Sequence, residues 1–155
     1  MSKTILITAA LRMEAPAALV RSQYRDIDHH IRNNVHPDIA YRWEPAAPGE
    51  RKIRTTFRIL GIPQHDVSVL EDAPDGSFVI RYLEGTNAGM VLVHEFIPLE
   101  DGATEVRLSA NAPATLGRKI LGPLFKIGAR RVMEKALRED KIDIEKGNYR
   151  PENAS

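Results

Sequence analysis

Along seven stretches of the chain, apolar residues recur at every second position, the spacing of strands that bury one face of a sheet. In the first stretch, residues 3–13, the odd-numbered positions from Ile5 to Met13 are all apolar. Turns rich in Gly, Asp and Pro separate the later stretches, which predicts an antiparallel meander. These later stretches cover approximately residues 39–44, 53–59, 67–69, 78–83, 90–97 and 104–110.

Three segments depart from this alternation and are predicted to be helices. Pro16 stands early in a short helix within residues 14–20, where its missing N–H is not needed. A second short helix covers about 26–33 and ends before Pro37. The last helix, Gly122–Glu145, is apolar along one side and long enough to cover the sheet. We therefore expect an α+β fold in which a curved seven-stranded antiparallel sheet surrounds a long C-terminal helix, with two short helices after the first strand.

The length and composition fit one globular domain. A chain of 155 residues with 43% hydrophobic residues can bury a sizeable core. We place this domain at residues 1–146. Residues 147–155 contain little to bury and are predicted to form a loose tail.

Charge and composition exclude several classes of function. Lys and Arg number 22 against 21 Asp and Glu, so the chain lacks the basic excess typical of proteins that bind nucleic acid. No apolar run approaches the 18 residues of an integral membrane segment, and the N-terminus lacks the pattern of a signal peptide. The absence of cysteine excludes disulfides and thiolate sites, and we expect a cytoplasmic protein.

Two local motifs, together with the order of the elements, resemble a known superfamily. The segment EAPAALV, residues 14–20, follows the first strand, and FIPLEDGATEVRLSA, residues 96–110, forms a strand–turn–strand unit. Both resemble segments of the START-like, or polyketide cyclase/dehydrase (SRPBCC), superfamily. The resemblance implies the helix-grip fold, with an internal cavity that members use for lipids, sterols, aromatic polyketides and plant hormones. It does not imply one particular reaction.

A shorter stretch is similar to the iron-binding motif of Rieske-type ring-hydroxylating oxygenases, whose catalytic domains share this fold. Asp28 and His36 match the motif by spacing, but Ile31 occupies the position of the first histidine ligand, and His30 stands one residue early. One residue on a helix rotates a side chain by about 100°. We therefore expect no metal site and no cofactor, with His30 and His36 as the weak candidates for metal ligands.

The resemblance to the oxygenases also implies a carboxylate ligand from the last helix, for which Asp140 or Asp143 is available. The simpler interpretation of the histidine cluster, His29, His30 and His36, is solvent-exposed polarity on a short helix and at its end. We expect this interpretation to hold.

His94 is the main polar candidate for the cavity. It shares its side of the predicted strand with Leu92 and Phe96, so it is expected to face either a bound ligand or a core neighbour such as Tyr82. The side chains predicted to contact a ligand are Tyr41, Trp43, Phe57, Phe78, Tyr82, Leu92, His94, Phe96 and Leu124.

Two further expectations concern the surface. Arginines at the opposite positions of the strands predict a solvated outer face of the sheet. Residues 116–138 combine apolar and basic side chains, which suggests either transient contact with a membrane or an ordinary helix that packs its apolar side on the sheet. The glycines Gly117 and Gly122 suggest a mobile gate.

Together these patterns favour non-covalent binding of an apolar, aromatic or lipid-like molecule, for sequestration or transfer, by a monomer or homodimer. An enzyme is the alternative, either a cyclase/dehydratase with acid–base chemistry at His94 or a degenerate metal-dependent oxygenase-like domain at His30 and His36. A third alternative is a module that binds another protein through the sheet or the last helix.

Overall fold

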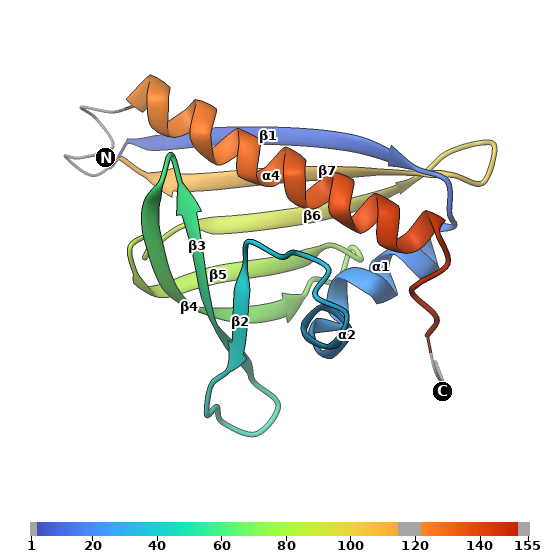
Figure 1. Cartoon of the computed structure of the whole chain (residues 1–155), viewed down its shortest axis with the longest axis horizontal. Helices are drawn as coiled ribbons and strands as arrows, with labels where there is room; N and C mark the ends of the chain where they lie inside the picture. The colour runs from blue at the N-terminus through green and yellow to red at the C-terminus, as the bar shows by residue number, and fades with distance from the viewer. Residues whose placement is uncertain (1–2, 115–121, 152–155) are drawn as a thin grey trace.

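The computed structural model describes residues 3–114 and 122–151 and confirms the expected α+β architecture. One antiparallel sheet of seven strands curves around a long C-terminal helix, and two short helices follow the first strand (Figure 1). The elements are β1 (Thr4–Met13), α1 (Ala17–Arg25), α2 (Ile27–Arg32), β2 (Ala40–Trp43), β3 (Arg51–Ile59), β4 (Ile62–Asp72), β5 (Phe78–Gly85), β6 (Val91–Pro98), β7 (Thr104–Pro113) and α4 (Gly122–Glu145).

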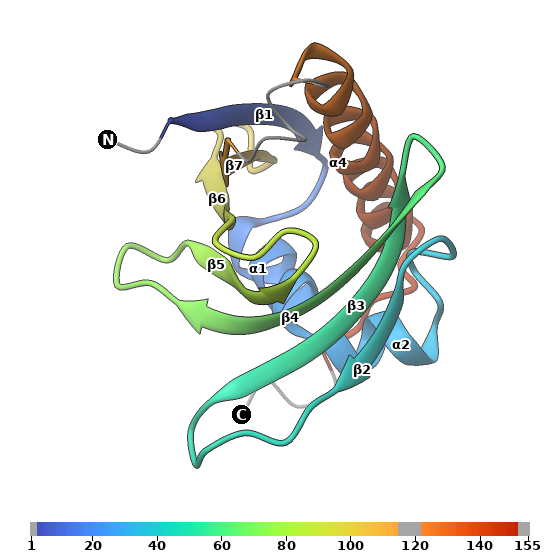
Figure 2. The same ribbon diagram turned by 90° about the vertical axis from the view of Figure 1, so that its left-hand side faces the viewer.

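The strands follow the order β1-β7-β6-β5-β4-β3-β2. Strands β2 to β7 form a meander, and β1 joins it by pairing with β7. This arrangement puts β1 at one edge and the short β2 at the other. Figure 2 shows how strongly the sheet bends, with α4 lying across its open side.

The helix α4 runs along β1 and covers the open side of the curved sheet (Figure 1). Its Gly128 lies so close to the β3–β4 turn that a Cβ atom there would be 2.6 Å from Leu60 Cγ. Leu137 and Met133 on α4 are buried against the core, as are Ile7 and Val106 on the sheet. The apolar stripe of α4 and the concave face of the sheet thus form one core, as the helical spacing predicts.

Strand β4 is much longer than the apolar alternation predicts. Its first half buries polar side chains, and Gln64 and Asp66 are both almost inaccessible to solvent. The Nδ2 atom of Asn87 donates to Gln64 Oε1 and to Asp66 Oδ2, so these buried groups satisfy one another. An apolar pattern cannot reveal such a strand, because its inward positions are polar.

A β-bulge between Val67 and Ser68 also shifts the register of β4 against β5. Opposite Asp66 of β4, Gly85 has a φ of 107°, and a Cβ atom there would meet the His65 carbonyl oxygen at 1.9 Å. Only glycine allows this close approach. After the bulge, Ser68 is buried on the inner face.

The predicted loose tail is wrong for Tyr149. This side chain is buried, with its ring centroid 4.8 Å from that of His29. The backbone N–H groups of Asn148 and Tyr149 both donate to the Asp143 carbonyl. Folded packing therefore extends beyond residue 147. The low apolar content of the tail hid this contact, because one aromatic residue carries it.

The predicted gate at Gly117 lies outside the described residues, as do Leu116, Ile120 and Leu121 of the basic segment. Of the other apolar residues of that segment, Leu124 is exposed on α4, whereas Phe125 packs against the core. Within the described residues, no helix is long and apolar enough to cross a membrane.

Candidate functional site

An internal cavity of about 140 Å³ lies between the concave face of the sheet and α4. Most of its lining is apolar, contributed by β1, β3, β5, β6, β7 and α4. Two histidines and an aspartate that lie next to one another, His30, His36 and Asp140, line the same cavity. We call the part of the cavity lined by these three residues its polar end.

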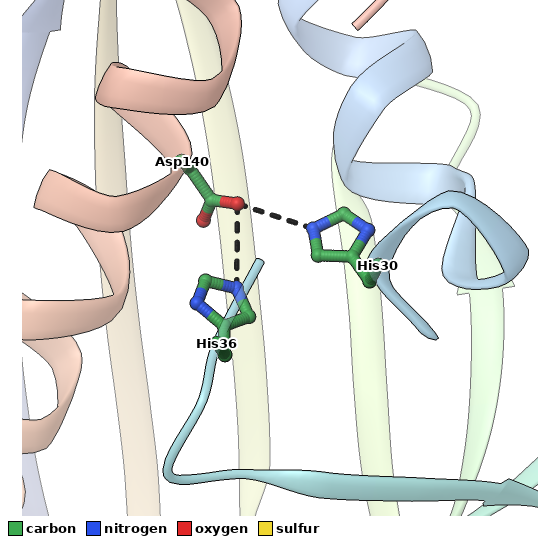
Figure 3. Close-up of side chains that lie close together, drawn as sticks. All are labelled: His30, His36 and Asp140. Atoms are coloured by element: carbon green, nitrogen blue, oxygen red, sulfur yellow. Dashed lines mark hydrogen bonds and ion pairs between the residues drawn. The ribbon is translucent and has the colours of Figure 1, made fainter. Parts of the chain in front are cut away.

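At the polar end, His30, His36 and Asp140 point toward one another (Figure 3). The Oδ1 atom of Asp140 lies 3.1 Å from His30 Nε2 and 3.3 Å from His36 Nε2. All three side chains are buried, each with a relative exposure of 5% or less. The potential ligand atoms of the three residues lie within 4.8 Å of one another.

The prediction that these histidines are solvent-exposed is wrong, and so is the prediction that their rings do not converge. That prediction rested on His30, which stands one residue before the motif position at Ile31 on the helix predicted over about 26–33. In the structure α2 ends at Arg32, and Asn34 has a φ of 48° in the left-handed region. The chain therefore turns back after α2 and brings the His36 ring within 5.2 Å of the His30 ring, so the two rings converge although His30 stands one residue early.

The short helix α2 is held in place by its N-terminal cap. The Asp26 side chain accepts a hydrogen bond from the His29 backbone N–H at 2.9 Å. This cap fixes the first turn of α2, from which His30 projects toward α4. Asp28, which matched the oxygenase motif by spacing, is exposed and accepts a hydrogen bond from Trp43 Nε1.

Both cluster histidines use Nδ1 for a contact outside the cluster. His30 Nδ1 lies 2.8 Å from the Asp26 carbonyl oxygen, which can only accept, so Nδ1 must carry the proton. His36 Nδ1 lies 3.1 Å from the carboxylate of Glu139. These contacts orient both rings so that Nε2 faces Asp140.

Charge within the cluster is strongly coupled. Burial would raise the pKa of Asp140, but His36 and His30 lower it well below its ordinary value. Burial likewise lowers the pKa of His36, but the carboxylates of Asp140 and Glu139 outweigh it and raise that pKa to about 9. Asp140 is therefore ionised and His36 protonated at neutral pH in the metal-free protein.

His29 and Asp143 form a second buried pair beside the cluster. His29 Nε2 lies 2.7 Å from Asp143 Oδ2, and His29 Nδ1 accepts a hydrogen bond from Asn33 Nδ2. Gln23 Nε2 joins the two sites, since it donates to Asp140 Oδ1 at 2.9 Å and to Asp143 Oδ2 at 3.1 Å. Of the two carboxylates proposed from the sequence, Asp140 thus contacts His30 and His36, while Asp143 contacts His29.

His94 lies buried on β6 and lines the cavity, as its strand position predicted. Its Nδ1 donates to the Phe78 carbonyl oxygen at 3.0 Å, and its ring packs against Tyr24 and Phe78. Burial lowers the pKa of His94 to about 4, so the ring is neutral at pH 7. Its Nε2 therefore carries a lone pair and can accept a hydrogen bond.

Three hydroxyl groups in the cavity wall have no hydrogen-bond partner among the described residues. They belong to Tyr24, Thr55 and Ser68, and all three oxygen atoms are buried. Burial, and then the negative charge of Asp140, raise the pKa of Tyr24, so its hydroxyl keeps its proton. A buried polar group without a partner costs about 1–3 kcal/mol, so these three groups indicate a place for a polar ligand atom.

Sequence analysis did not identify these hydroxyl groups. Thr55 could have been found, because it shares its side of β3 with Ile53 and Phe57. Ser68 was missed because its apolar neighbours Val67 and Val69 suggested that the odd-numbered positions of β4 face inward, whereas the even-numbered positions from 64 to 70 are all buried.

Six of the nine side chains predicted to contact a ligand line the cavity: Tyr41, Phe57, Phe78, Tyr82, Leu92 and His94. The other three do not line it. Leu124 is exposed near the start of α4, and Trp43 is exposed at the end of the edge strand β2. Phe96 is buried, but it packs edge-on against Tyr24 instead of facing the cavity.

Comparisons with known proteins place the chain by its fold. No family model matches the sequence, and no curated protein matches it. The structure is similar to TTHA0849 from Thermus thermophilus, with a TM-score of 0.80 and 13% identity over 94% of this chain and 100% of that one. It is similar to a START superfamily protein from Mycobacterium smegmatis, with a TM-score of 0.75 and 14% identity over 91% and 97% of the two chains.

A third similar structure is an enzyme with bound ligands. Norcoclaurine synthase from Thalictrum flavum, in complex with dopamine and hydroxybenzaldehyde, matches with a TM-score of 0.66 and 17% identity over 93% of this chain and 88% of that one. The resemblance to START-like proteins is thus confirmed at the level of the fold. The comparisons do not support the resemblance to ring-hydroxylating oxygenases.

Proposed function

Starting from the helix-grip fold that this chain shares with START-like proteins, we propose that it binds one small apolar molecule in the internal cavity, without covalent chemistry. We further propose that the ligand is a single aromatic ring that carries a hydroxyl or carbonyl group. The observation that carries this proposal is the set of three buried hydroxyl groups without a partner among the described residues, in a cavity that is otherwise mostly apolar.

The size of the cavity supports a ligand of one ring. An apolar cavity of about 150 Å³ in another protein is large enough to bind benzene, and this cavity measures about 140 Å³. Burial of the ring would supply about 25 cal/mol for each Å² of apolar surface removed from water. A long acyl chain would need a larger space, so the volume argues against a lipid-sized ligand.

The polar groups of the cavity support a ligand with hydrogen-bonding capacity. Tyr24, Thr55 and Ser68 can each donate or accept, and the neutral His94 can accept at Nε2. A hydroxyl group on the ligand would find both kinds of partner. Dopamine and hydroxybenzaldehyde, the ligands in the similar norcoclaurine synthase structure, are single rings of this kind.

The charge state of His94 argues against the acid–base enzyme considered from the sequence. A general base works best when its pKa lies near the working pH. Burial lowers the pKa of His94 to about 4, which makes it a weak base at pH 7. Its contact with the Phe78 carbonyl suits an orienting hydrogen-bond acceptor instead.

The proposal is tested by titrating the ¹⁵N-labelled protein with phenol, toluene and a medium-chain fatty acid. We expect phenol to bind more tightly than toluene, by roughly 5- to 100-fold, because a recovered hydrogen bond to a buried group contributes about 1–3 kcal/mol. The perturbed amides should surround the cavity. Equal affinity for phenol and toluene, or preferential binding of the fatty acid, would contradict the proposal.

A further inference from the structure

We propose that His30, His36 and Asp140 bind one divalent transition-metal ion at the polar end of the cavity. This inference goes beyond the proposed function, because a small ring can bind to the apolar wall with or without an ion. It rests on the positions of the three side chains, on the protons that their neighbours fix and on the chemistry of the donor atoms.

The distances from the carboxylate to each of the two imidazoles fit a shared ion. Zinc and similar ions bind imidazole nitrogen and carboxylate oxygen at about 2.0–2.2 Å. Two ligand atoms at such distances lie roughly 3.0–3.5 Å apart when the bond angle is between octahedral and tetrahedral values. The two distances from Asp140 Oδ1, 3.1 Å to His30 Nε2 and 3.3 Å to His36 Nε2, fall in this range.

The hydrogen bonds of the two rings direct lone pairs at the same point. Nδ1 of His30 must donate to the Asp26 carbonyl, and Nδ1 of His36 faces the Glu139 carboxylate. A neutral imidazole with its proton on Nδ1 presents a lone pair at Nε2. Without an ion, His36 meets the Asp140 carboxylate as an imidazolium, and its proton on Nε2 lies between the two groups. When that proton leaves, the lone pairs of both rings face the same carboxylate oxygen, and a metal ion can take the place of the proton. A backbone carbonyl or carboxylate that accepts from the other ring nitrogen is the usual support of a histidine that binds metal.

The neighbouring pair shows the opposite arrangement. His29 Nδ1 accepts from Asn33 Nδ2, and the same amide nitrogen also donates to the His29 carbonyl oxygen, which identifies it as the donor. The proton of His29 is therefore on Nε2 and is donated to Asp143 Oδ2 at 2.7 Å. This pair is complete as a hydrogen bond and needs no ion. The two buried His–Asp sites thus differ in where the proton must lie.

The donor set selects the class of ion. Two imidazoles and one carboxylate suit Zn²⁺, Fe²⁺, Co²⁺ or Ni²⁺, whereas Mg²⁺ and Ca²⁺ prefer oxygen ligands. The negative charges of Asp140 and of the adjacent Glu139 can balance a doubly charged ion. Three protein ligands leave further coordination positions, and all three residues line the cavity, so a molecule in the cavity would lie beside the ion.

The test uses untagged full-length protein, stripped with a chelator and titrated with Zn²⁺ by calorimetry and with Co²⁺ by visible absorption. We expect one ion per chain, with imidazole and oxygen ligands in X-ray absorption spectra of the Zn²⁺-loaded protein. His36→Gln, His30→Gln and Asp140→Asn should each weaken Zn²⁺ binding at least 10- to 100-fold. Circular dichroism shows which of these variants are folded. Only the folded variants are used to judge the loss of Zn²⁺ affinity.

Two variants serve as matched controls. Asp143→Asn removes a carboxylate that is equally buried and lies on the same helix, and His65→Ala removes a histidine outside the cluster. Both should keep the Zn²⁺ affinity of the wild type within about threefold. A wild-type protein that takes up no ion, or equal losses in Asp140→Asn and Asp143→Asn, would overturn the proposal. Spectra without imidazole ligands would overturn it as well. Phenol binding, measured separately with stripped protein, reports on the proposed function alone.

Discussion

Asp140 Oδ1 lies 3.3 Å from His36 Nε2, although Asp140 stands near the C-terminal end of α4 and His36 in the loop that follows α2. Both side chains are buried, and each shifts the pKa of the other toward its charged form. The contact joins the last helix of the chain to the segment between α2 and β2. It therefore couples the stability of the fold to the electrostatics of the cavity.

This contact predicts the effect of removing its carboxylate from the metal-free protein. Asp140→Asn should lower the free energy of unfolding by about 3–5 kcal/mol, because it leaves a buried imidazolium without its counter-charge. In the double variant with His36→Gln, the loss should be smaller than the sum of the two single losses. Urea denaturation measures both.

The control Asp38→Asn removes an exposed carboxylate that pairs with Lys135, and it should cost less than about 1 kcal/mol. Strictly additive losses would show that the two side chains are not coupled.

Zinc should stabilise the wild-type protein through the same three residues. At a free concentration about 100 times the dissociation constant, a ligand that binds only the folded state adds about 2.7 kcal/mol. Thermal unfolding with and without Zn²⁺ should show this gain in the wild type and in Asp143→Asn. At the same concentration it should fall to about 1.4 kcal/mol or less in His36→Gln, and to about 0.4 kcal/mol if the affinity drops 100-fold. A gain of the same size in His36→Gln would place the ion elsewhere.

The buried His94 predicts a loss of stability in mild acid. Its pKa is about 4 in the folded protein, against 6.5 for an unperturbed histidine. Between these values the unfolded chain binds more protons, so the free energy of unfolding decreases as the pH falls from 6.5 to 4. The contribution of His94 amounts to roughly 3 kcal/mol. This contribution to the free energy of unfolding is fully present above pH 6.5 and is lost below pH 4.

The variant His94→Asn can keep the hydrogen bond to the Phe78 carbonyl through its amide, but its side chain does not titrate. The loss of stability that His94 causes between pH 6.5 and pH 4 should therefore disappear in this variant. The pKa of His94 also depends on the charges of three neighbours that remain in the variant, Asp140, His30 and His36. The measurement is therefore the difference between the two curves of unfolding free energy against pH. Parallel curves from pH 6.5 to pH 4 would contradict the burial argument.

The hydroxyl of Thr55 predicts a conflict between stability and binding. Thr55→Val removes a buried oxygen without a partner among the described residues, so it should stabilise the ligand-free protein by about 1 kcal/mol and weaken phenol binding more than toluene binding. Thr104 is the matched control, because its buried hydroxyl donates to the Ala15 carbonyl at 2.7 Å. Thr104→Val should destabilise the protein by about 1 kcal/mol. Urea denaturation distinguishes the two, and destabilisation by Thr55→Val would indicate that its hydroxyl already has a partner.

Tyr149 predicts that the end of the chain contributes to folding. Tyr149→Ala removes a ring that is buried against His29 and should cost roughly 3 kcal/mol. Arg150→Ala, at the exposed neighbouring position, should change stability by no more than about 0.5 kcal/mol. Thermal unfolding of the two variants gives the comparison. Equal stability of both variants would restore the prediction of a loose tail from residue 147.

The sequence alone determined the elements, because their signals are local. The alternation of apolar residues predicted all seven strands, although only a short part of β4, and the helical spacing predicted α4 and its end at about Glu145. The inward position of His94 followed from its neighbours on one strand. These patterns repeat every two or about 3.6 residues, so each is visible within a short window.

Only the tertiary structure decided what the polar residues do. The left-handed Asn34 turns the chain back after α2, and His36 then meets a carboxylate on α4 that no spacing rule connects with it. The bulge before Ser68 and the contact of Tyr149 with His29 likewise depend on segments that are distant in sequence. The physical reason is that a buried polar group is stabilised by the partner it finds in space, whereas an apolar residue is placed by the side of the strand or helix on which it lies.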